Sequence, residues 1–233
     1  MTDRPGTVPV PRALVRRLWV GLGGAAVFTG IATLQGAVRP DYDPWHQSVS
    51  ALSLGPGGWV QQGNFVFFGV LLLVTVPTLR RMLAGGIGAR SYPICIAISG
   101  TALVVLGFVP QDPAPGYDPQ HLALAAPTAL GLVHIALAGV TVGASVTGLF
   151  IMAKRFAHDP CWHRWATYTR IVALLTIACV VVYAVWSTHA TGLAGTFERL
   201  AILATPAWGV AFAVRLGRGV PFMISPSSGS LVR

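Results

Sequence analysis

Charged residues are scarce in this chain. Only 10% of its 233 residues are Asp, Glu, Lys or Arg, 54% are hydrophobic, and the mean hydropathy is +0.66. Soluble domains usually carry about 25% charged residues, so the composition excludes an ordinary soluble enzyme and a disordered chain. Acidic residues are the scarcer sign, seven against sixteen basic ones. We expect no nucleic-acid partner, because such binding needs a basic face on a soluble domain.

Cysteine and lysine are also rare. The three cysteines have neither metal-site spacing nor a plausible pairing, so we expect reduced structural thiols. Lys154 is the single lysine among 16 basic residues, a bias typical of a high-GC bacterial genome. The expected location is therefore the bacterial cell (cytoplasmic) membrane.

Long apolar runs take the place of charge. A membrane-spanning helix needs about 20 predominantly apolar residues, and we identify six candidates: Leu18–Val38, Val60–Leu79, Pro93–Pro110, Pro127–Ala153, Ile171–Trp186 and Phe197–Leu216. The first run is too long for a cleaved signal peptide. We therefore predict an all-α integral membrane protein with three parts: a cytoplasmic N-terminal segment (1–17), a six-helix transmembrane domain (18–216) and a disordered cytoplasmic tail (217–233).

Basic residues alternate between the predicted loops. Fourteen of the sixteen fall in the N-terminal segment, the second and fourth loops and the tail, which leaves Arg39 and Arg199 on the other side. The positive-inside rule then predicts that both termini are cytoplasmic. Five of the seven acidic residues fall in the outer loops. Any ligand or reaction site is therefore expected at the extracytoplasmic face.

The first outer loop has the most distinctive sequence. Asp43-Pro44 is typical of a helix start and Gly55-Pro56 of a helix stop. Together they predict a short amphipathic helix of about eleven residues lying flat in the outer interface. Asp43 and His46 are candidate ligand-binding residues, and Ser48 and Ser50 are candidate nucleophiles. These polar groups either meet water and headgroups or roof a cavity between the spans.

The second outer loop and the fourth span hold a second group of candidates. Asp112 and His121 lie in the loop, and His134 lies roughly 10 Å below the outer end of the span. Imidazole and carboxylate groups suit zinc or another divalent ion. These three residues are therefore candidates for ligand or metal binding, and His134 also for catalysis. In the alternative interpretation His134 is a hydrogen-bonded structural residue and the Asp-Pro pairs are helix caps; no particular cofactor is indicated.

Two further pairs stand out. Arg199, another ligand-binding candidate, could hold a phosphate together with Arg39, or could snorkel to the interface. Glu198, beside Arg199, is expected to pair with another loop rather than with its neighbour. Gly139 and Gly143 form a GxxxG motif, which predicts close helix packing.

The outer loops carry a set of motifs that resembles a known family. These motifs are Arg39-Pro-x-Tyr-Asp-Pro44, Ser48-Val-Ser50-x-Leu52, Gly55-Pro-x-Gly-Trp59, Pro110-x-Asp112-Pro113, Gly131-x-x-His134 and Glu198-Arg199-Leu200. They resemble the bacterial membrane proteins called domain of unknown function 998 (DUF998). The resemblance implies a six-helix integral membrane protein and no particular activity. The fourth span of that family often begins with His-Gly-x-x-His, whereas Leu130 stands at the first of these positions here.

Three functions of different class fit these patterns. The first is binding or handling of membrane lipids through a polar cavity at the extracytoplasmic face. The second is a membrane-embedded lipid hydrolase, metal-dependent or serine-based. The third is an accessory subunit of a membrane complex. The expected partners are accordingly membrane lipids and either another membrane protein or a second copy of this chain.

Overall fold

The computed structural model describes residues 7–8, 10–113, 117–118, 126–188, 192–220 and 222–223, and this part of the chain contains six α-helices. Their bounds are α1 (Arg12–Val38), α2 (Gly58–Met82), α3 (Ser91–Leu106), α4 (Ala129–Ala157), α5 (His163–Trp186) and α6 (Ala194–Gly217). A 3-10 helix, η1 (Val49–Ser53), separates α1 from α2. Two short strands, β1 (Thr7–Val8) and β2 (Phe222–Met223), pair antiparallel. The prediction of an all-α fold is confirmed apart from this strand pair.

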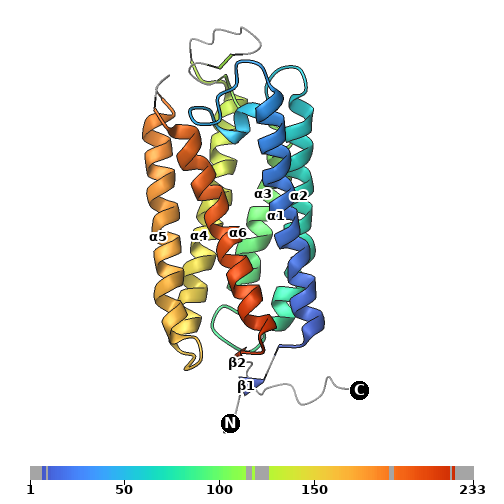
Figure 1. Cartoon of the computed structure of the whole chain (residues 1–233), viewed down its shortest axis with the longest axis vertical. Coiled ribbons are helices and arrows are strands. Elements are labelled where there is room, and N and C mark those ends of the chain that lie inside the picture. The colour runs from blue at the N-terminus through green and yellow to red at the C-terminus, as the bar shows by residue number, and fades with distance from the viewer. Residues whose placement is uncertain are drawn as a thin grey trace.

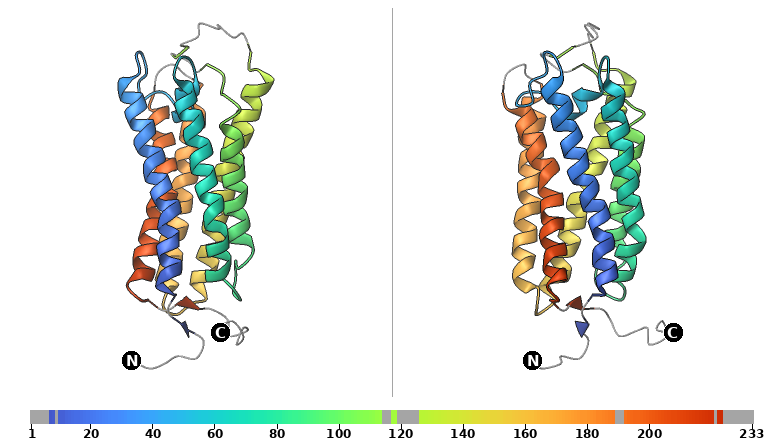
Figure 2. Two further views of the ribbon diagram at one scale, coloured as in Figure 1. Left: turned by 90° about the vertical axis from the view of Figure 1, so that its right-hand side faces the viewer. Right: turned by 45° about the vertical axis from the view of Figure 1, so that its right-hand side comes forward.

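The helices form a closed ring of antiparallel neighbours (Figures 1 and 2). Each helix packs against the next one in the chain, and α6 returns to α1 through a less extensive contact. The strands β1 and β2 lie at one end of the ring, which we call the terminal end. The helix η1 lies at the opposite end, which we call the η1 end.

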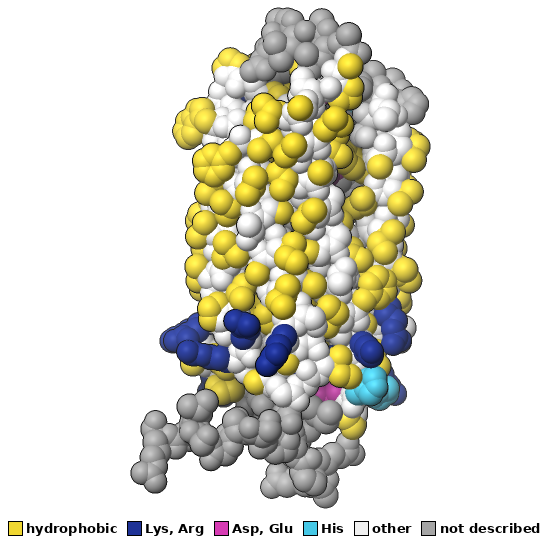
Figure 3. Space-filling model, turned by 180° about the vertical axis from the view of Figure 1, so that it is seen from behind, with side chains coloured by type: hydrophobic (Ala, Val, Ile, Leu, Met, Phe, Trp, Pro, Cys, Tyr) yellow, Lys and Arg dark blue, Asp and Glu magenta, His cyan; other side chains and the backbone are white. Residues whose placement is uncertain are grey.

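The outer surface of the ring is that of a membrane protein. In the described part of the chain, five helices (α1, α2, α4, α5 and α6) are long and apolar enough to cross a membrane, and α3 is apolar but shorter at 16 residues. Hydrophobic side chains cover the flank seen in Figure 3, and Lys and Arg form a band near the terminal end. The chain is therefore a multi-pass membrane protein.

Five of the six described helices begin earlier than the apolar runs suggested, and α4 begins two residues later. The first helix starts at Arg12 rather than Leu18, and the fifth at His163 rather than Ile171. The added turns carry basic and polar residues, which a hydropathy criterion does not count. They leave the apolar stretch of each helix unchanged and extend the helix beyond it.

Aromatic side chains close the terminal end. Phe156 stacks on Trp162 at 5.1 Å between ring centroids, and Phe222 of β2 packs edge-on against both rings. The Arg155 guanidinium lies 4.6 Å from the centroid of the Phe222 ring. Phe222 is fully buried, so the predicted disorder of the tail does not hold at Phe222–Met223. Of the rest of the predicted tail, residues 217–220 are described, and residues 221 and 224–233 lie outside the described part of the chain.

The GxxxG motif does not mediate helix packing within the ring. A Cβ atom added at Gly139 or Gly143 would meet nothing within 4 Å, and both residues are exposed. The contact between α3 and α4 instead passes through Gly148, which lies against Tyr92. The sequence prediction for this motif is therefore wrong within a single chain.

Candidate functional site

The loop between α1 and α2 folds inward over the η1 end of the ring. All five residues of η1 are buried, and Ala51 and Leu52 are fully so. They pack in one apolar cluster with Phe28 of α1 and Phe65 of α2. The predicted amphipathic helix of about eleven residues at the membrane interface is therefore wrong. The helical part is short, Ser48 rather than Asp43 caps it, and both of its faces are covered.

Side chains of α1 hold the end of this loop. Arg39 donates hydrogen bonds to the carbonyl oxygens of Leu52 at 2.6 Å and Pro56 at 2.5 Å, and also to that of Leu54. The Gln35 amide donates to the Leu52 carbonyl at 3.1 Å and to the Gly57 carbonyl at 3.0 Å. The guanidinium of Arg39 is thus directed at the protein backbone.

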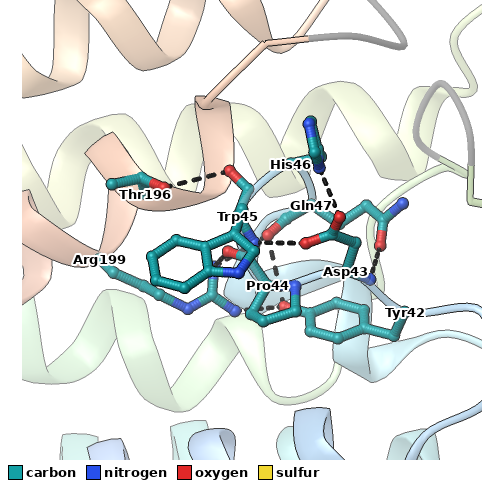
Figure 4. A network of polar contacts seen from close by, with 8 residues as sticks. All are labelled: Tyr42, Asp43, Pro44, Trp45, His46, Gln47, Thr196 and Arg199. Carbon is teal, nitrogen blue, oxygen red and sulfur yellow. Dashed lines mark hydrogen bonds and ion pairs between the residues drawn. The ribbon is translucent and has the colours of Figure 1, made fainter.

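The beginning of the same loop caps helix α6. The first amides of a helix have no partner inside it, and here the loop supplies two: the Gly195 N–H donates to the His46 carbonyl at 3.1 Å and the Thr196 N–H to the Trp45 carbonyl at 3.0 Å. The Thr196 hydroxyl also donates to the Trp45 carbonyl, at 3.3 Å (Figure 4). A Cβ atom at Gly195 would lie 2.5 Å from the Pro44 carbonyl oxygen. Glycine is therefore required where the loop crosses α6.

Arg199 and Glu198 of α6 hold the loop from below. Arg199 Nη1 donates to the carbonyl oxygens of Pro44 at 2.6 Å and Gln47 at 2.9 Å, and Nη2 donates to the Tyr42 hydroxyl (Figure 4). Glu198 Oε2 accepts from the Val49 N–H at 2.5 Å. Burial raises the pKa of Tyr42 to about 12, although the Arg199 charge opposes this. The sequence suggested that Arg39 and Arg199 could hold a phosphate together, but both guanidinium groups bind loop carbonyl oxygens.

Asp43 and His46 form a partly exposed pair in the same part of the loop that Arg199 contacts. Asp43 Oδ2 lies 2.6 Å from His46 Nδ1, and Asp43 Oδ1 accepts from the Trp45 N–H at 2.8 Å. The slight burial of Asp43 raises its pKa, but the hydrogen bonds from Trp45 and His46 outweigh this and lower it. The carboxylate thereby stabilises the turn that presents the Trp45 and His46 carbonyls to α6.

We expect this turn to loosen in acid. A group whose pKa is lower in the folded state stabilises it above the unfolded pKa, about 3.9 for Asp, and this contribution is lost as the pH falls through the folded pKa. Amide hydrogen-exchange protection at Trp45, corrected for intrinsic rates, should therefore fall below about pH 4. An Asp43→Asn variant should show a flat profile. Equal protection of the wild type at pH 7 and pH 3 would contradict this role.

The serine candidates do not meet a histidine base. Ser48 is buried, and its Oγ accepts from the Ala51 N–H and donates to Gln111 Oε1, each at 3.1 Å. Ser50 is buried within η1, whereas His46 points to Asp43 at the surface (Figure 4). Ser48 therefore joins the first loop to the second, and the Ser–His spacing seen in the sequence does not bring the two groups together.

Asp112 holds the N-cap residue of helix α4. Its two carboxylate oxygens accept from the Thr128 N–H at 2.7 Å and from the Thr128 hydroxyl at 2.6 Å. Thr128 is the N-cap, and its Oγ1 accepts from the Gly131 N–H at 3.0 Å. A side chain at Gly131 would overlap the Asp112 carboxylate, so Gly131 of the Gly-x-x-His motif leaves room for it. Asp112 therefore supports the start of α4 from the loop and does not cap a helix that begins at its own proline.

His134 positions the second loop. It is only 3% exposed, and its Nδ1 lies 2.6 Å from the Val109 carbonyl oxygen, so Nδ1–H donates there. Its ring packs edge-on against Phe65 at 6.4 Å. Within the described part of the chain, Nε2 is buried without a hydrogen-bond partner. His134 thus fixes the position of the chain segment that leads to Asp112.

A metal site is not formed by the described residues. No group of three His, Cys, Asp or Glu side chains gathers within them. His121, the third metal candidate, lies outside this part of the chain. Asp112 and His134 are brought close to each other, but each is directed at its own backbone partner.

A half-open cavity of about 280 Å³ lies between the two loops. It forms where α3 ends early, at Leu106, between the η1 ends of α2 and α4, which stand apart in Figure 2. One wall is Ser53, Leu54, Gly55, Trp59 and Gln62, and the other is Pro110, Gln111, Asp112, Pro113, Thr128 and Leu130. Trp59 is 73% exposed and Leu130 59% exposed, so both stand at the rim.

The sequence indicated only part of this cavity. Asp112 was identified as a candidate, but Gln62, Gln111 and Leu130 were not. Neutral amides and an exposed leucine near a helix start carry no distinctive signal. The one available hint was the shortness of the third apolar run, which leaves room between its neighbours.

Residues 22–215 match a protein-family profile described as "Protein of unknown function (DUF998)". Neither a curated protein nor a solved structure matches the chain. The matched region contains α2 to α5 in full, α1 from residue 22 onward and α6 up to residue 215. It also contains the Arg39, Glu198 and Arg199 contacts with the first loop and the described walls of the cavity.

Proposed function

Since the chain belongs to the DUF998 family, which has no assigned activity, its function has to come from its own site, and we propose that it binds a membrane lipid at the η1 end. The cavity between Trp59 and Leu130 supports this proposal. Its lining combines polar side chains with apolar ones, and two of the apolar ones, Trp59 and Leu130, are strongly exposed. Such a mixed lining matches the headgroup end of an amphiphile.

The η1 end is the extracytoplasmic end in this proposal. The band of Lys and Arg at the terminal end (Figure 3) supports this orientation, because basic residues concentrate on the cytoplasmic side. Both described strands, β1 and β2, lie at that same end, which fits two cytoplasmic termini and an even number of crossings. All six helices, α3 included, then span the bilayer.

The size of the cavity suits a headgroup rather than a whole lipid. At about 280 Å³ it is slightly smaller than typical small-molecule sites, which span about 300–1,000 Å³. The acyl chains would remain outside, along exposed apolar side chains of α4 such as Leu130 and Val133. The protein then holds a lipid at the rim of the bilayer without extracting it.

Trp59 offers a direct test. The protein is placed in nanodiscs in which a small fraction of the lipid is brominated, since bromine quenches indole fluorescence on contact. Trp45 serves as the matched control, because it is 62% exposed at the same end and does not line the cavity. Difference spectra against Trp59→Phe and Trp45→Phe isolate each residue. We expect Trp59 quenching to saturate at a low brominated fraction and Trp45 quenching to rise in proportion to it.

Two leucines of α4 provide a second control. Leu130 and Leu132 are similarly exposed, at 59% and 55%, but only Leu130 lines the cavity. Removing part of a leucine contact costs about 1 kcal/mol, so Leu130→Ala should weaken the saturable quenching about fivefold and Leu132→Ala should not. Proportional quenching of both tryptophans in the wild type would refute a lipid site.

A further inference from the structure

The charge of the cavity is unusual for a lipid-headgroup site. Among the residues that line it, Asp112 carries a charge and neither Lys nor Arg is present. Arg39 contacts the Leu54 carbonyl, but its guanidinium also binds Leu52 and Pro56 and is not part of the lining. The lining therefore bears a net negative charge although the chain as a whole has a formal charge of +9.

Most hydrogen-bond donors of the lining already bond to acceptors of the protein. The Ser53 hydroxyl donates to the Ser50 carbonyl at 2.7 Å, and the Thr128 hydroxyl donates to Asp112. The Gln62 amide donates to the Ser53 carbonyl at 3.4 Å. A carboxylate has about four acceptor positions, so Asp112 retains acceptor capacity after its two bonds to Thr128. Gln111 accepts from Ser48 through Oε1, which leaves its amide nitrogen to donate to an ester or phosphate oxygen.

Asp112 also blocks anions. A helix N-terminus with free amides is a ready binding site for a phosphate group, and α4 begins at this cavity. Asp112 lies at that terminus, where it accepts from the N–H of the N-cap residue Thr128 and fills the space beside Gly131. A bare anionic headgroup would have to approach this carboxylate, which costs free energy through like-charge repulsion.

Trp59 completes a site for a cation. An indole face attracts an ammonium group placed within about 6 Å of it, and Trp59 stands at the rim of a cavity that contains a carboxylate. We propose, on the basis of the lipid-binding function above, that this cavity selects an ammonium group, carried by an amine-bearing headgroup such as that of phosphatidylethanolamine. Asp112 provides the charge that selects it, and Trp59 covers the mouth.

The experiment compares two brominated lipids in the Trp59 quenching assay. One is phosphatidylethanolamine, whose headgroup has an ammonium group besides the phosphate. The other is phosphatidylglycerol, whose only charged group is the anionic phosphate. The expected preference for the ammonium lipid is about fivefold to tenfold, the combined effect of one partly exposed ion pair and one cation–π contact. Asp112→Asn removes the charge but keeps a good capping side chain, so it should fold as the wild type does and lose the preference.

Soluble ethanolamine distinguishes the two sources of an ammonium group. If millimolar ethanolamine relieves the quenching by the brominated lipid, a free amine suffices for the site. If it does not, the ammonium must come with a lipid, and the proposal holds in its narrower form. An equal or reversed headgroup preference in the wild type would overturn the proposal, as would a preference that survives in Asp112→Asn. Saturable quenching by both lipids alike would overturn only the ammonium selection, whereas loss of saturable quenching would remove the lipid site itself.

Discussion

The Gly195→Ala variant is expected to lose more than about 3 kcal/mol of stability. The new methyl group would overlap the Pro44 and Gln47 carbonyl oxygens, which are backbone atoms and cannot rotate away. The loop must shift, and the two hydrogen bonds from Gly195 and Thr196 to it break. Each bond contributes about 1 kcal/mol and each buried group left unpaired costs about 1–3 kcal/mol. A thermal shift in detergent should show a fall in Tm of roughly 6 °C or more, at 2–4 °C per kcal/mol for a chain of this size.

Gly30→Ala is the matched control. Gly30 also lies in a helix, α1, but a Cβ atom there would meet nothing within 4 Å. Alanine is favoured over glycine inside a helix by about 0.5–1 kcal/mol, so Tm should stay or rise slightly. Equal Tm values for the two variants would show that the loop does not rest on α6 as closely as described.

The Arg155→Met variant is expected to destabilise the terminal end by about 3 kcal/mol. Arg155 is only 5% exposed and donates to the Leu83 carbonyl at 3.1 Å and the Ile87 carbonyl at 2.9 Å. It also lies over the ring of Phe222. Hydrogen bonds from a charged group contribute about 1.5–3 kcal/mol each. A fall in Tm of roughly 6–12 °C is therefore expected, together with faster proteolysis after the strand β2.

Lys154→Met provides the control for charge. Lys154 precedes Arg155 on α4 but is exposed, so its replacement removes the same charge without breaking a buried contact. Its effect on stability should be below about 0.5 kcal/mol, which corresponds to a change in Tm of about 1–2 °C or less. If both variants lower Tm equally, the band of basic residues acts through its total charge and the Arg155 contacts add nothing.

The fold was largely predictable because a membrane imposes a simple rule. Apolar runs such as Leu18–Val38 need helical structure to satisfy their backbone in lipid, so the helices and their order follow from hydropathy. The bounds do not follow from it, because turns such as those at Arg12 and His163 lie beyond the apolar run.

The site was predictable only in its location. The polar outer residues do gather at one end, but Arg39, Arg199 and Glu198 bind loop backbone rather than a ligand. Glu198 reaches Val49, 149 residues away in sequence, and a single sequence gives no sign of such a contact. The prediction of an amphipathic helix was wrong for the same reason, because these contacts with the loop backbone hold η1 in a buried position. Asp112 binds Thr128, the N-cap residue of a helix that begins only after the second loop, and an Asp-Pro pair gives no sign of such a distant partner.

The short helix α3 has a consequence for the surrounding bilayer. Its 16 residues span about 24 Å at 1.5 Å per residue, whereas the hydrocarbon layer is about 30 Å thick. Its neighbours α2 and α4, at 25 and 29 residues, are long enough for a full crossing. With α3 as a sixth span, as proposed above, this hydrophobic mismatch lies on one flank, where the bilayer has to thin or its lipids have to tilt to cover α3. On that proposal the protein should partition into thinner membranes, and a lipid approaching that flank would bring its headgroup down toward Asp112.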